Sequence, residues 1–383
     1  MKTTEAILNQ VHQERNHSTS TQKSYTRAIK YFEKHTGKTL GDLLTIADHE
    51  ETDNVHWKNS TLKPLLVSYR KYLFDNYSEN TAELYLTAVM TIFRHFEIVI
   101  GPLPYYSKNN IMKSPMILPG SLPDRDILKQ VLELKNPLLK AITLFMSSSG
   151  MSRIDTLNLR VIDYINATKE YHEETNIYSA ISKMRDSEVD IIPCFQGLVR
   201  QKTKREYFTF CSHEAVAAIN NYLMSRTDDF NNYSPLFQIH ERYLSKVFKK
   251  VNDQLGLGNA GRYSRFAPHM LRRYHATQLS SAGMSSDNIN LLEGRKVAGV
   301  LFESYIRIKP EDLKKEYIQA LPYLVVEDIN RVRTELDVAN EKNVKLESEN
   351  KELREQNERI DKLEQLVLGS ISDDKLAQLN KLL

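Results

Sequence analysis

The segment APHMLRRYHATQL, which begins at residue 267, carries two side chains able to bind an anion. His269 and Arg272 are three residues apart, so on a helix they project from the same face. The guanidinium offers a rigid fork of donors that matches phosphate oxygens, and the imidazole can donate to an oxygen or transfer a proton. Taken alone, this common pattern favours a surface pair or a helix cap over a phosphate site. Metal binding is disfavoured, because His269 and His275 are six residues apart and no Cys cluster accompanies them.

Three other segments hold side chains that would complete a phosphate site. Arg153 follows SSSGM at an expected junction between two helices, and Asp155 could orient it. Lys202 lies in RQKT, where the tip of a β-hairpin can carry a cation into a cleft. Tyr305 lies in FESYIRI, after the Gly294–Arg295 turn, although in isolation it is one of 20 tyrosines.

The elements around these residues are expected to be mainly helical. Residues 20–98 show three amphipathic helical patterns, and residues 100–122 contain four prolines and two glycines without periodicity. A second helical region follows, and β-branched and aromatic residues surround a charged turn between Val189 and Ser212. Helical patterns then continue to about Leu324. The sequence therefore predicts a mainly α fold with one small antiparallel sheet.

The composition of the 383-residue chain is that of a globular protein, with 41% hydrophobic and 26% charged residues. Two cysteines cannot build a disulfide framework, and there is no apolar targeting or membrane-length segment, so we expect a cytosolic or nuclear protein. The net charge of +3 is unevenly distributed. From residue 326 on there are 10 Lys and Arg against 14 Asp and Glu, which leaves 42 against 35 before it. A basic body is compatible with DNA binding without requiring it.

The order Arg, Lys, His-x-x-Arg, Tyr resembles that of the tyrosine recombinase family, which includes phage integrases and Xer-like proteins. PHMLRR, ATQL and LLEG make the resemblance specific, and it covers roughly residues 20–325. It implies the following site residues: Arg153 as the first arginine, Lys202 as the hairpin lysine, His269 and Arg272 as the second box, and Tyr305 as the nucleophile. It also implies a helical core-binding, DNA-clamping domain at residues 1–99, a linker at 100–120 and a catalytic domain at 121–325.

Details of the motifs are more similar to archaeal and archaeal-virus integrases than to bacterial ones. Arg295 follows Gly294 where most members have Gly-His or a Trp, and we include Arg295 among the predicted site residues. Tyr305 falls ten residues after Arg295, one more than the usual bacterial spacing. Arg153 comes one residue later than in the common Gly-Leu-Arg pattern, with Asp155 two residues after it.

The residues carried over from this family would perform phosphoryl transfer without a metal or another cofactor. Guanidinium groups stabilise the charge that grows on the non-bridging phosphate oxygens. Tyr305 attacks and forms a 3′-phosphotyrosyl bond, which conserves the bond energy for rejoining. Lys202 can protonate the departing 5′-oxygen, while His269 assists proton transfer or holds the phosphate.

Residues 326–368 show heptads that predict a coiled coil. Their a positions are Ile329, Leu336, Asn343, Asn350, Asn357 and Glu364, and their d positions are Val332, Ala339, Leu346, Leu353, Ile360 and Val367. The three asparagines favour a two-stranded, in-register pair, although a solitary solvated helix or an intramolecular hairpin is the alternative. Residues 369–383 end in KLAQLNKLL, a short amphipathic helix by its pattern.

These features together predict a site-specific DNA recombinase that acts on double-stranded DNA and does not bind a membrane. The chain would form a coiled-coil dimer, and the family resemblance implies a tetramer on two DNA sites. Two alternatives remain open from the sequence. One is a type IB-like nicking-closing enzyme with the same residues, and the other is a non-catalytic, coiled-coil-assembled DNA-binding protein.

Overall fold

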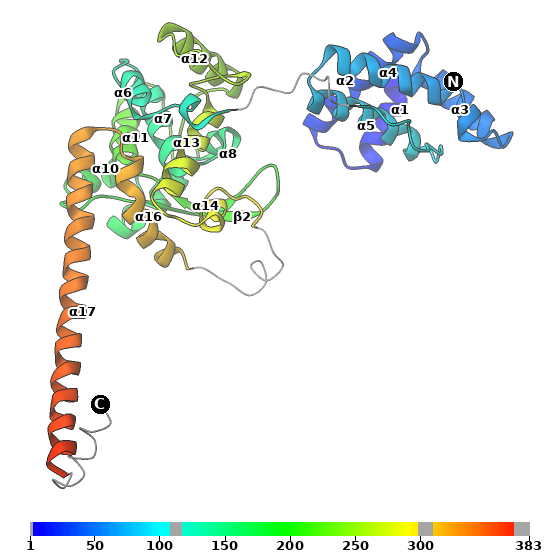
Figure 1. The fold of residues 1–383 in the computed structure, drawn as a ribbon. Coiled ribbons are helices and arrows are strands. Elements are labelled where there is room, and N and C mark those ends of the chain that lie inside the picture. Colours follow the sequence, from blue (N-terminus) through cyan, green and yellow to red (C-terminus); the bar gives the residue numbers. More distant parts are fainter. Residues whose placement is uncertain (1–2, 108–116, 298–308, 371–383) are drawn as a thin grey trace. The chain divides into compact units, whose positions relative to one another are not determined.

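A computed structural model describes residues 3–107, 117–297 and 309–370 of the chain, which divides into two units, Met1–Met116 and Ile117–Leu383 (Figure 1). The first unit is helical. Its helices are α1 (Thr4–Glu14), α2 (Thr19–Thr36), α3 (Leu40–Thr52), the 3-10 helix η1 (Trp57–Asn59), α4 (Leu62–Asn76) and α5 (Glu79–His95). The sequence sets the ends of α2: the Ser18 hydroxyl accepts from the Thr21 amide, and Gly37 closes the helix with a φ of 68°.

The core of the first unit lies between α2, α4 and α5. Phe32, Tyr69 and Phe93 are fully buried there, and the Tyr69 hydroxyl donates to the Ala28 carbonyl at 3.0 Å. The start of the segment expected as a linker packs on this same unit. The Arg70 Nη1 donates to the Pro104 carbonyl at 2.8 Å, and Ile100 belongs to the core.

The second unit combines helices with a small sheet. Its helices are α6 (Arg125–Leu132), α7 (Pro137–Ser149), α8 (Arg153–Asn158), α9 (Val161–Ala167), α10 (Ile177–Arg185), α11 (His213–Ser225), α12 (Glu241–Gln254), α13 (Pro268–Ser281), α14 (Ser286–Leu292), α16 (Pro310–Leu324) and α17 (Asp328–Ser370), with the 3-10 helices η2 (Pro119–Ser121) and η3 (Lys169–Tyr171). Helix α7 is central, because its residues from Ala141 to Ser149 are buried and it packs on both α11 and α13.

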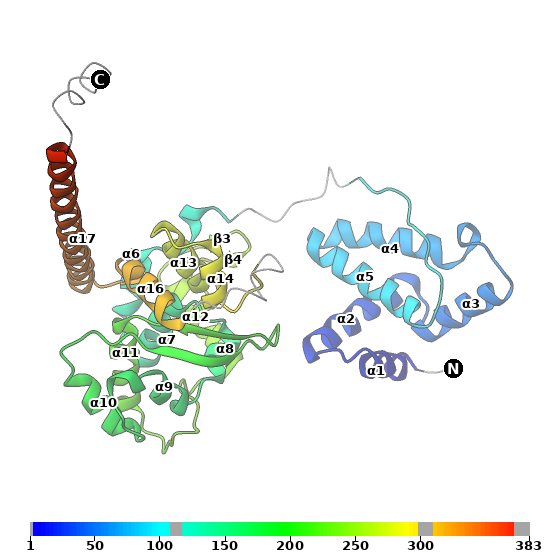
Figure 2. The same cartoon turned by 90° about the horizontal axis from the view of Figure 1, so that it is seen from below.

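The predicted hairpin is confirmed as β1 (Cys194–Val199) paired antiparallel with β2 (Glu206–Phe210). Helix α9 packs against β1, whereas α7, α14 and α16 pack against β2 (Figure 2). A second two-stranded sheet, β3 (Asn259–Ala260) with β4 (Tyr263–Ser264), was not expected. Strands of two residues are too short to show an alternating hydrophobic pattern.

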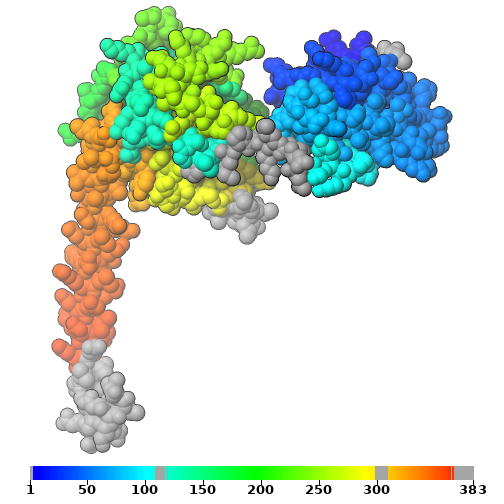
Figure 3. Space-filling view, turned by 45° about the horizontal axis from the view of Figure 1, so that its top comes forward, coloured from blue at the N-terminus to red at the C-terminus, as the bar shows by residue number. Residues whose placement is uncertain are grey.

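Helix α17 is joined to the second unit at its first turns. The buried Glu214 carboxylate of α11 accepts from the amides of Val326 and Glu327 at 2.8 and 2.9 Å, and Val326 is fully buried. From Ala339 to Leu363 every residue of α17 is exposed (Figure 3). The helical part of the tail prediction therefore agrees with the structure, while its pairing with a second chain stays a prediction.

No helix within the described ranges combines the length and the apolar character needed to cross a bilayer.

Candidate active site

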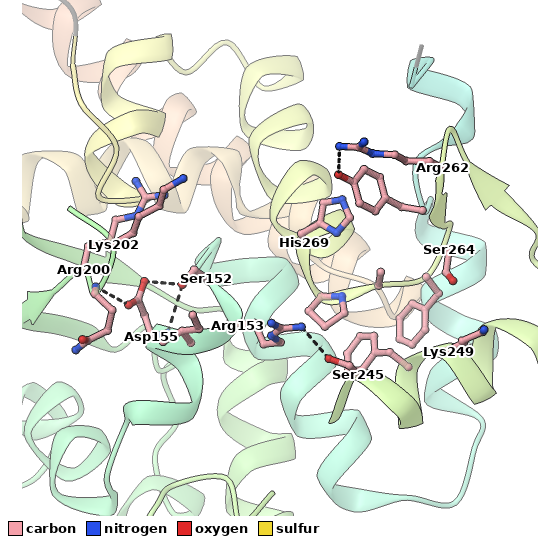
Figure 4. A pocket seen from close by; sticks show the side chains of 17 residues that line it. Ser152, Arg153, Asp155, Arg200, Lys202, Ser245, Lys249, Arg262, Ser264 and His269 are labelled. Carbon is pink, nitrogen blue, oxygen red and sulfur yellow. Dashed lines mark hydrogen bonds between the residues drawn. The ribbon is translucent and has the colours of Figure 1, made fainter. Parts of the chain in front are cut away.

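A cleft of about 640 Å³ in the second unit gathers several of the predicted site residues (Figure 4). Its walls come from the start of α8, the tip of the β1–β2 hairpin, α12, the β3–β4 ribbon and the start of α13. Among the described residues, five cationic side chains and a single carboxylate, Asp155, line it; the cations are Arg153, Arg200, Lys202, Lys249 and Arg262. An excess of positive charge around a cavity attracts an anion of matching size.

Arg153 reaches this cleft from the first turn of α8. Its Nη1 donates to the Ser245 hydroxyl at 2.7 Å, and its Nη2 donates to the Glu241 carboxylate at 2.5 Å, both on α12. Asp155 does not orient Arg153, in contrast to the expectation from the sequence. The Asp155 carboxylate instead accepts from the Ser152 hydroxyl at 2.6 Å and from the Gln201 amide at 3.0 Å. Asp155 therefore ties the hairpin tip to the start of α8.

Lys202 lies at the exposed tip of the hairpin and lines the cleft, as predicted from the turn sequence. The turn at the tip is closed by Arg200, whose amide donates to the Arg205 carbonyl at 2.8 Å. The Arg200 side chain also reaches the turn after α14, where its Nη1 donates to the Gly294 carbonyl at 2.8 Å. These bonds, together with that of Asp155, hold the lysine-bearing tip at the edge of the cleft.

His269 and Arg272 both lie in the first turns of α13, at different depths. His269 is exposed at the cleft wall, with its ring edge-to-face against the Tyr263 ring at 4.4 Å between centroids. The surrounding protein, and then the positive charges of Arg273 and Arg153, lower the pKa of His269 below its usual value. The imidazole is therefore neutral at pH 7 in the protein without DNA.

Arg272 is buried beneath this surface and links three segments. Its Nη1 donates to the Gly150 carbonyl at 2.8 Å, and its Nη2 donates to the Glu293 carbonyl at 2.5 Å. Its Nε lies 3.2 Å from the Glu293 carboxylate. Burial lowers the pKa of Arg272, while the Glu293 charge acts in the opposite direction. These contacts fix the plane of the guanidinium before any ligand arrives.

Gly150, which ends α7, makes the contact with Arg272 possible. Its φ of 64° is in the left-handed region, where glycine is favoured. A Cβ at this position would lie 2.3 Å from the His275 Nδ1, so there is no room for a side chain. The glycine that the sequence places before Arg153 therefore permits close packing of α7 on α13.

Arg295, the last predicted cation, lies just after α14. Its Nε is 2.6 Å from the Glu293 carboxylate, and its side chain is 43% exposed. Arg272 and Arg295 thus share one carboxylate. The sequence reasoning missed Glu293, Arg200 and the α12 residues Glu241 and Ser245. The run of cations in RQKTKR could have identified Arg200, but the sequence holds no comparable signal for the other three residues.

The predicted nucleophile, Tyr305, lies outside the described residues. Two other tyrosines downstream of α14 could compete for this role. Tyr317 is fully buried and its hydroxyl donates to the Ser148 carbonyl at 2.8 Å, so it belongs to the core. Tyr323 is 43% exposed and does not line the cleft. Neither geometry suits an attack on a ligand in the cleft.

Comparisons with known proteins match the region that holds this cleft to a known protein family. The model of the phage integrase family matches residues 128–310. Among solved structures, a variant of the Tn1549 transposon integrase in complex with a circular intermediate DNA is 12% identical, with 82% of this chain and 99% of that chain covered and a TM-score of 0.51. The XerA recombinase is 15% identical, with 82% and 97% covered and a TM-score of 0.33.

The XerH site-specific recombinase bound to its difH substrate is 14% identical, with 66% of this chain and 70% of that chain covered and a TM-score of 0.41. No curated protein sequence matches the chain. The TM-score above 0.5 shows that the chain shares its fold with the Tn1549 integrase.

Proposed function

This chain carries a tyrosine recombinase domain of the phage integrase family, and from that premise we propose that it is a site-specific recombinase of double-stranded DNA. The observation that carries the proposal is the cationic cleft. Arg153, Lys202 and His269 line it, and it lies within the family-matched region. The Tn1549 integrase structure contains DNA, which supports DNA as the partner of this chain.

In the proposed reaction a DNA phosphodiester occupies the cleft. Arg153 and Arg272 stabilise the charge that builds on the non-bridging oxygens during in-line attack. The Tyr305 hydroxyl oxygen bonds to phosphorus as its proton passes to the neutral imidazole of His269 or to water and the bond to the 5′-oxygen breaks. Lys202 supplies a proton to the departing 5′-oxygen. His269, neutral at pH 7, assists the proton transfer or hydrogen-bonds to the phosphate. Reversal by a 5′-hydroxyl of another strand rejoins the DNA.

Assignment of the nucleophile rests on its position in the chain and on the geometry of its competitors. Tyr305 falls between α14, whose end carries Arg295, and α16. Tyr317 is committed to the core by burial and by its bond to Ser148. Arg272, held in place by Gly150 and Glu293, supports an active enzyme over a non-catalytic DNA-binding protein.

Assembly through α17 is a further part of the proposal. The a and d side chains Ile329, Val332, Leu336, Leu346, Leu353 and Ile360 are between 44% and 79% exposed. A stripe of apolar residues at heptad spacing is stabilised when a second helix covers it. We assign a second copy of this chain as that partner, which would bring two catalytic domains together and favour a tetramer on two DNA sites.

Covalent trapping tests the proposed function directly. The probes are nicked suicide duplexes covering the DNA that flanks the gene, incubated with the full chain in EDTA. A tyrosine recombinase should form a protein–DNA adduct through the 3′-phosphate without added metal, because arginines supply the charge stabilisation. A DNA-binding protein without this activity gives no adduct. A type IB-like enzyme gives the adduct and relaxes supercoiled DNA, but does not join two separate sites.

A further inference from the structure

The carboxylate of Glu293 is fully buried and lies at the centre of a cationic cluster just after α14. One of its oxygens is 2.6 Å from the Arg295 Nε and 3.2 Å from the Arg272 Nε. Its other oxygen is 3.2 Å from the His275 Nδ1. Glu293 therefore contacts Arg272, which the proposed mechanism uses, and Arg295, a further predicted site residue, without lining the cleft itself.

The balance of charge in this cluster suits a phosphate site. A buried carboxylate without a partner is strongly disfavoured, and here two guanidinium groups lie within 3.2 Å of the Glu293 carboxylate. Two arginines against one carboxylate leave one positive charge uncompensated. Glu293 therefore orders Arg272 and Arg295 without cancelling their attraction for a DNA phosphate.

Two hydrogen bonds and one ion pair show how the orientation of Arg272 is fixed. Each of its three nitrogens has a protein oxygen within 3.2 Å: the Gly150 carbonyl, the Glu293 carbonyl and the Glu293 carboxylate. A guanidinium has five N–H groups, so donors remain for a phosphate. Two of the three contacts come from Glu293, and the carboxylate is the one that a substitution can remove.

The turn that contains Glu293 has other anchors, so its charge is not needed to hold the backbone. The Arg200 Nη1 donates to the Gly294 carbonyl at 2.8 Å. The Tyr207 ring lies against Gly294, where an added Cβ would be 2.9 Å from it. Leu292 is fully buried at the end of α14. A neutral side chain of the same shape at position 293 should leave this turn in place.

We infer that Glu293 is a positioning residue, which holds Arg272 and Arg295 as one preorganised unit for the transition state of DNA cleavage. This inference deepens the proposed function and rests on it. Preorganised charges stabilise a transition state because they need no rearrangement as the reaction proceeds. Loss of the carboxylate should therefore slow the chemical step much more than it weakens DNA binding.

The test compares Glu293→Gln with the wild-type chain on a suicide duplex under single-turnover conditions. We expect adduct formation to slow by about 10- to 100-fold. This is the range seen in metal sites when a residue that orients a metal-binding side chain is replaced. The dissociation constant for DNA should change by less than about threefold, since affinity comes from many distributed phosphate contacts. Glu214→Gln is the matched control, because Glu214 is also buried but holds the base of α17. Its cleavage rate should stay at the wild-type value.

A double-mutant cycle separates positioning from a merely structural role. If Glu293 acts through Arg272, Glu293→Gln should add little further loss in an Arg272→Ala background. Glu293→Asp keeps the charge and should cleave faster than Glu293→Gln. The aspartate variant also keeps the test informative if the glutamine variant folds poorly. Two outcomes would overturn this inference and leave the proposed function standing. One is an unchanged cleavage rate for Glu293→Gln, and the other is a full additional loss of rate in the Arg272→Ala background. A wild-type chain that forms no adduct overturns the proposed function and this inference with it.

Discussion

At the scale of single residues, the account depends on Arg153 and Arg272 acting on a phosphate. Arg153 lines the cleft, while Arg272 is held beneath it by Gly150 and Glu293. Replacing either by Ala should slow cleavage on the order of 10³-fold, as arginine clamps do in other phosphoryl transfers. Arg273→Ala is the control on the same helix, because Arg273 is exposed. Single-turnover cleavage rates that match for Arg272→Ala and Arg273→Ala would contradict the assigned role.

The protonation of His269 gives a second prediction at this scale. Its pKa is lowered first by the surrounding protein atoms, which displace water from one side of the ring, and then by the charges of Arg273 and Arg153. The unfolded chain therefore takes up this proton at a higher pH than the folded chain, and below about pH 6.5 this site makes folding less favourable. Bound DNA brings a negative phosphate to His269, so binding should raise its pKa.

Histidine NMR titration measures this effect directly. The His269 ring signals of the free protein should titrate with a midpoint below 6.5, and the midpoint should rise when DNA is added. His269→Gln identifies the signal. A midpoint at or above 6.5 in the free protein would show that the neighbouring charges do not act on this ring.

At the scale of elements, the junction between α7 and α13 needs a glycine at position 150. Both Gly150 and Gly256 have left-handed backbones, with φ of 64° and 62°. The Cβ added by Gly256→Ala meets nothing within 4 Å, so this substitution should lower the free energy of unfolding by about 1 kcal/mol through backbone strain alone. Gly150→Ala places a Cβ 2.3 Å from the His275 ring, and this crowding should lower the free energy of unfolding by about a further 1–3 kcal/mol. Urea unfolding of both variants checks this, and equal midpoints would contradict the packing described here.

The elements also show where sequence reasoning succeeds and where it stops. The helix ends at Ser18 and Gly37, and the β1–β2 hairpin, follow from local signals that need no tertiary information. Three residues carried over from the family motif, Arg153, Lys202 and His269, line one cleft because α8, the hairpin and α13 converge there. The partners of Arg153 could not be predicted, since Glu241 and Ser245 lie about 90 residues away in sequence. Glu293 reads as an ordinary surface acid in LLEGR, and only its burial reveals its contacts.

At the scale of the whole molecule, assembly through α17 can be separated from the chemistry. The first residues of this tail are part of the second unit: Val326 is fully buried, and Thr334 is 3% exposed. A cut at residue 326 would therefore remove part of the core, whereas a cut after Asn340 spares it. The truncated chain should cleave a single suicide duplex normally but associate less and join two DNA sites poorly.

Light scattering over a concentration series tests this prediction. The measured mass of the full-length protein should rise with concentration above 44.4 kDa, the mass of one chain. The chain cut after Asn340 should keep its monomer mass at every concentration. Leu346→Lys with Leu353→Lys should have the same effect, because charges at two d positions disrupt the apolar layer. Glu355→Lys, on the outer face of the helix in this heptad assignment, is the control and should still associate. Monomer masses for the full-length chain would contradict the proposed coiled coil.

Replacing the three asparagines at 343, 350 and 357 by Ile should change the stoichiometry of the assembly. Buried asparagines at a positions favour two strands at a cost in stability, so their removal should tighten the association and allow trimers or larger species. Sedimentation equilibrium measures both effects. A dimer of unchanged affinity would show that these positions do not face a partner.

The most direct test of the central claim is to locate the covalent bond between the chain and DNA. The trapped adduct is digested with protease, and the peptide that retains the nucleotide is sequenced. The account predicts that the phosphate is attached to Tyr305, and that Tyr305→Phe binds the same DNA without forming an adduct, because it lacks the attacking oxygen. Tyr323→Phe, which changes the competing exposed tyrosine, should form the adduct normally. A phosphate found on Tyr323, or an adduct that persists in Tyr305→Phe, would contradict the account.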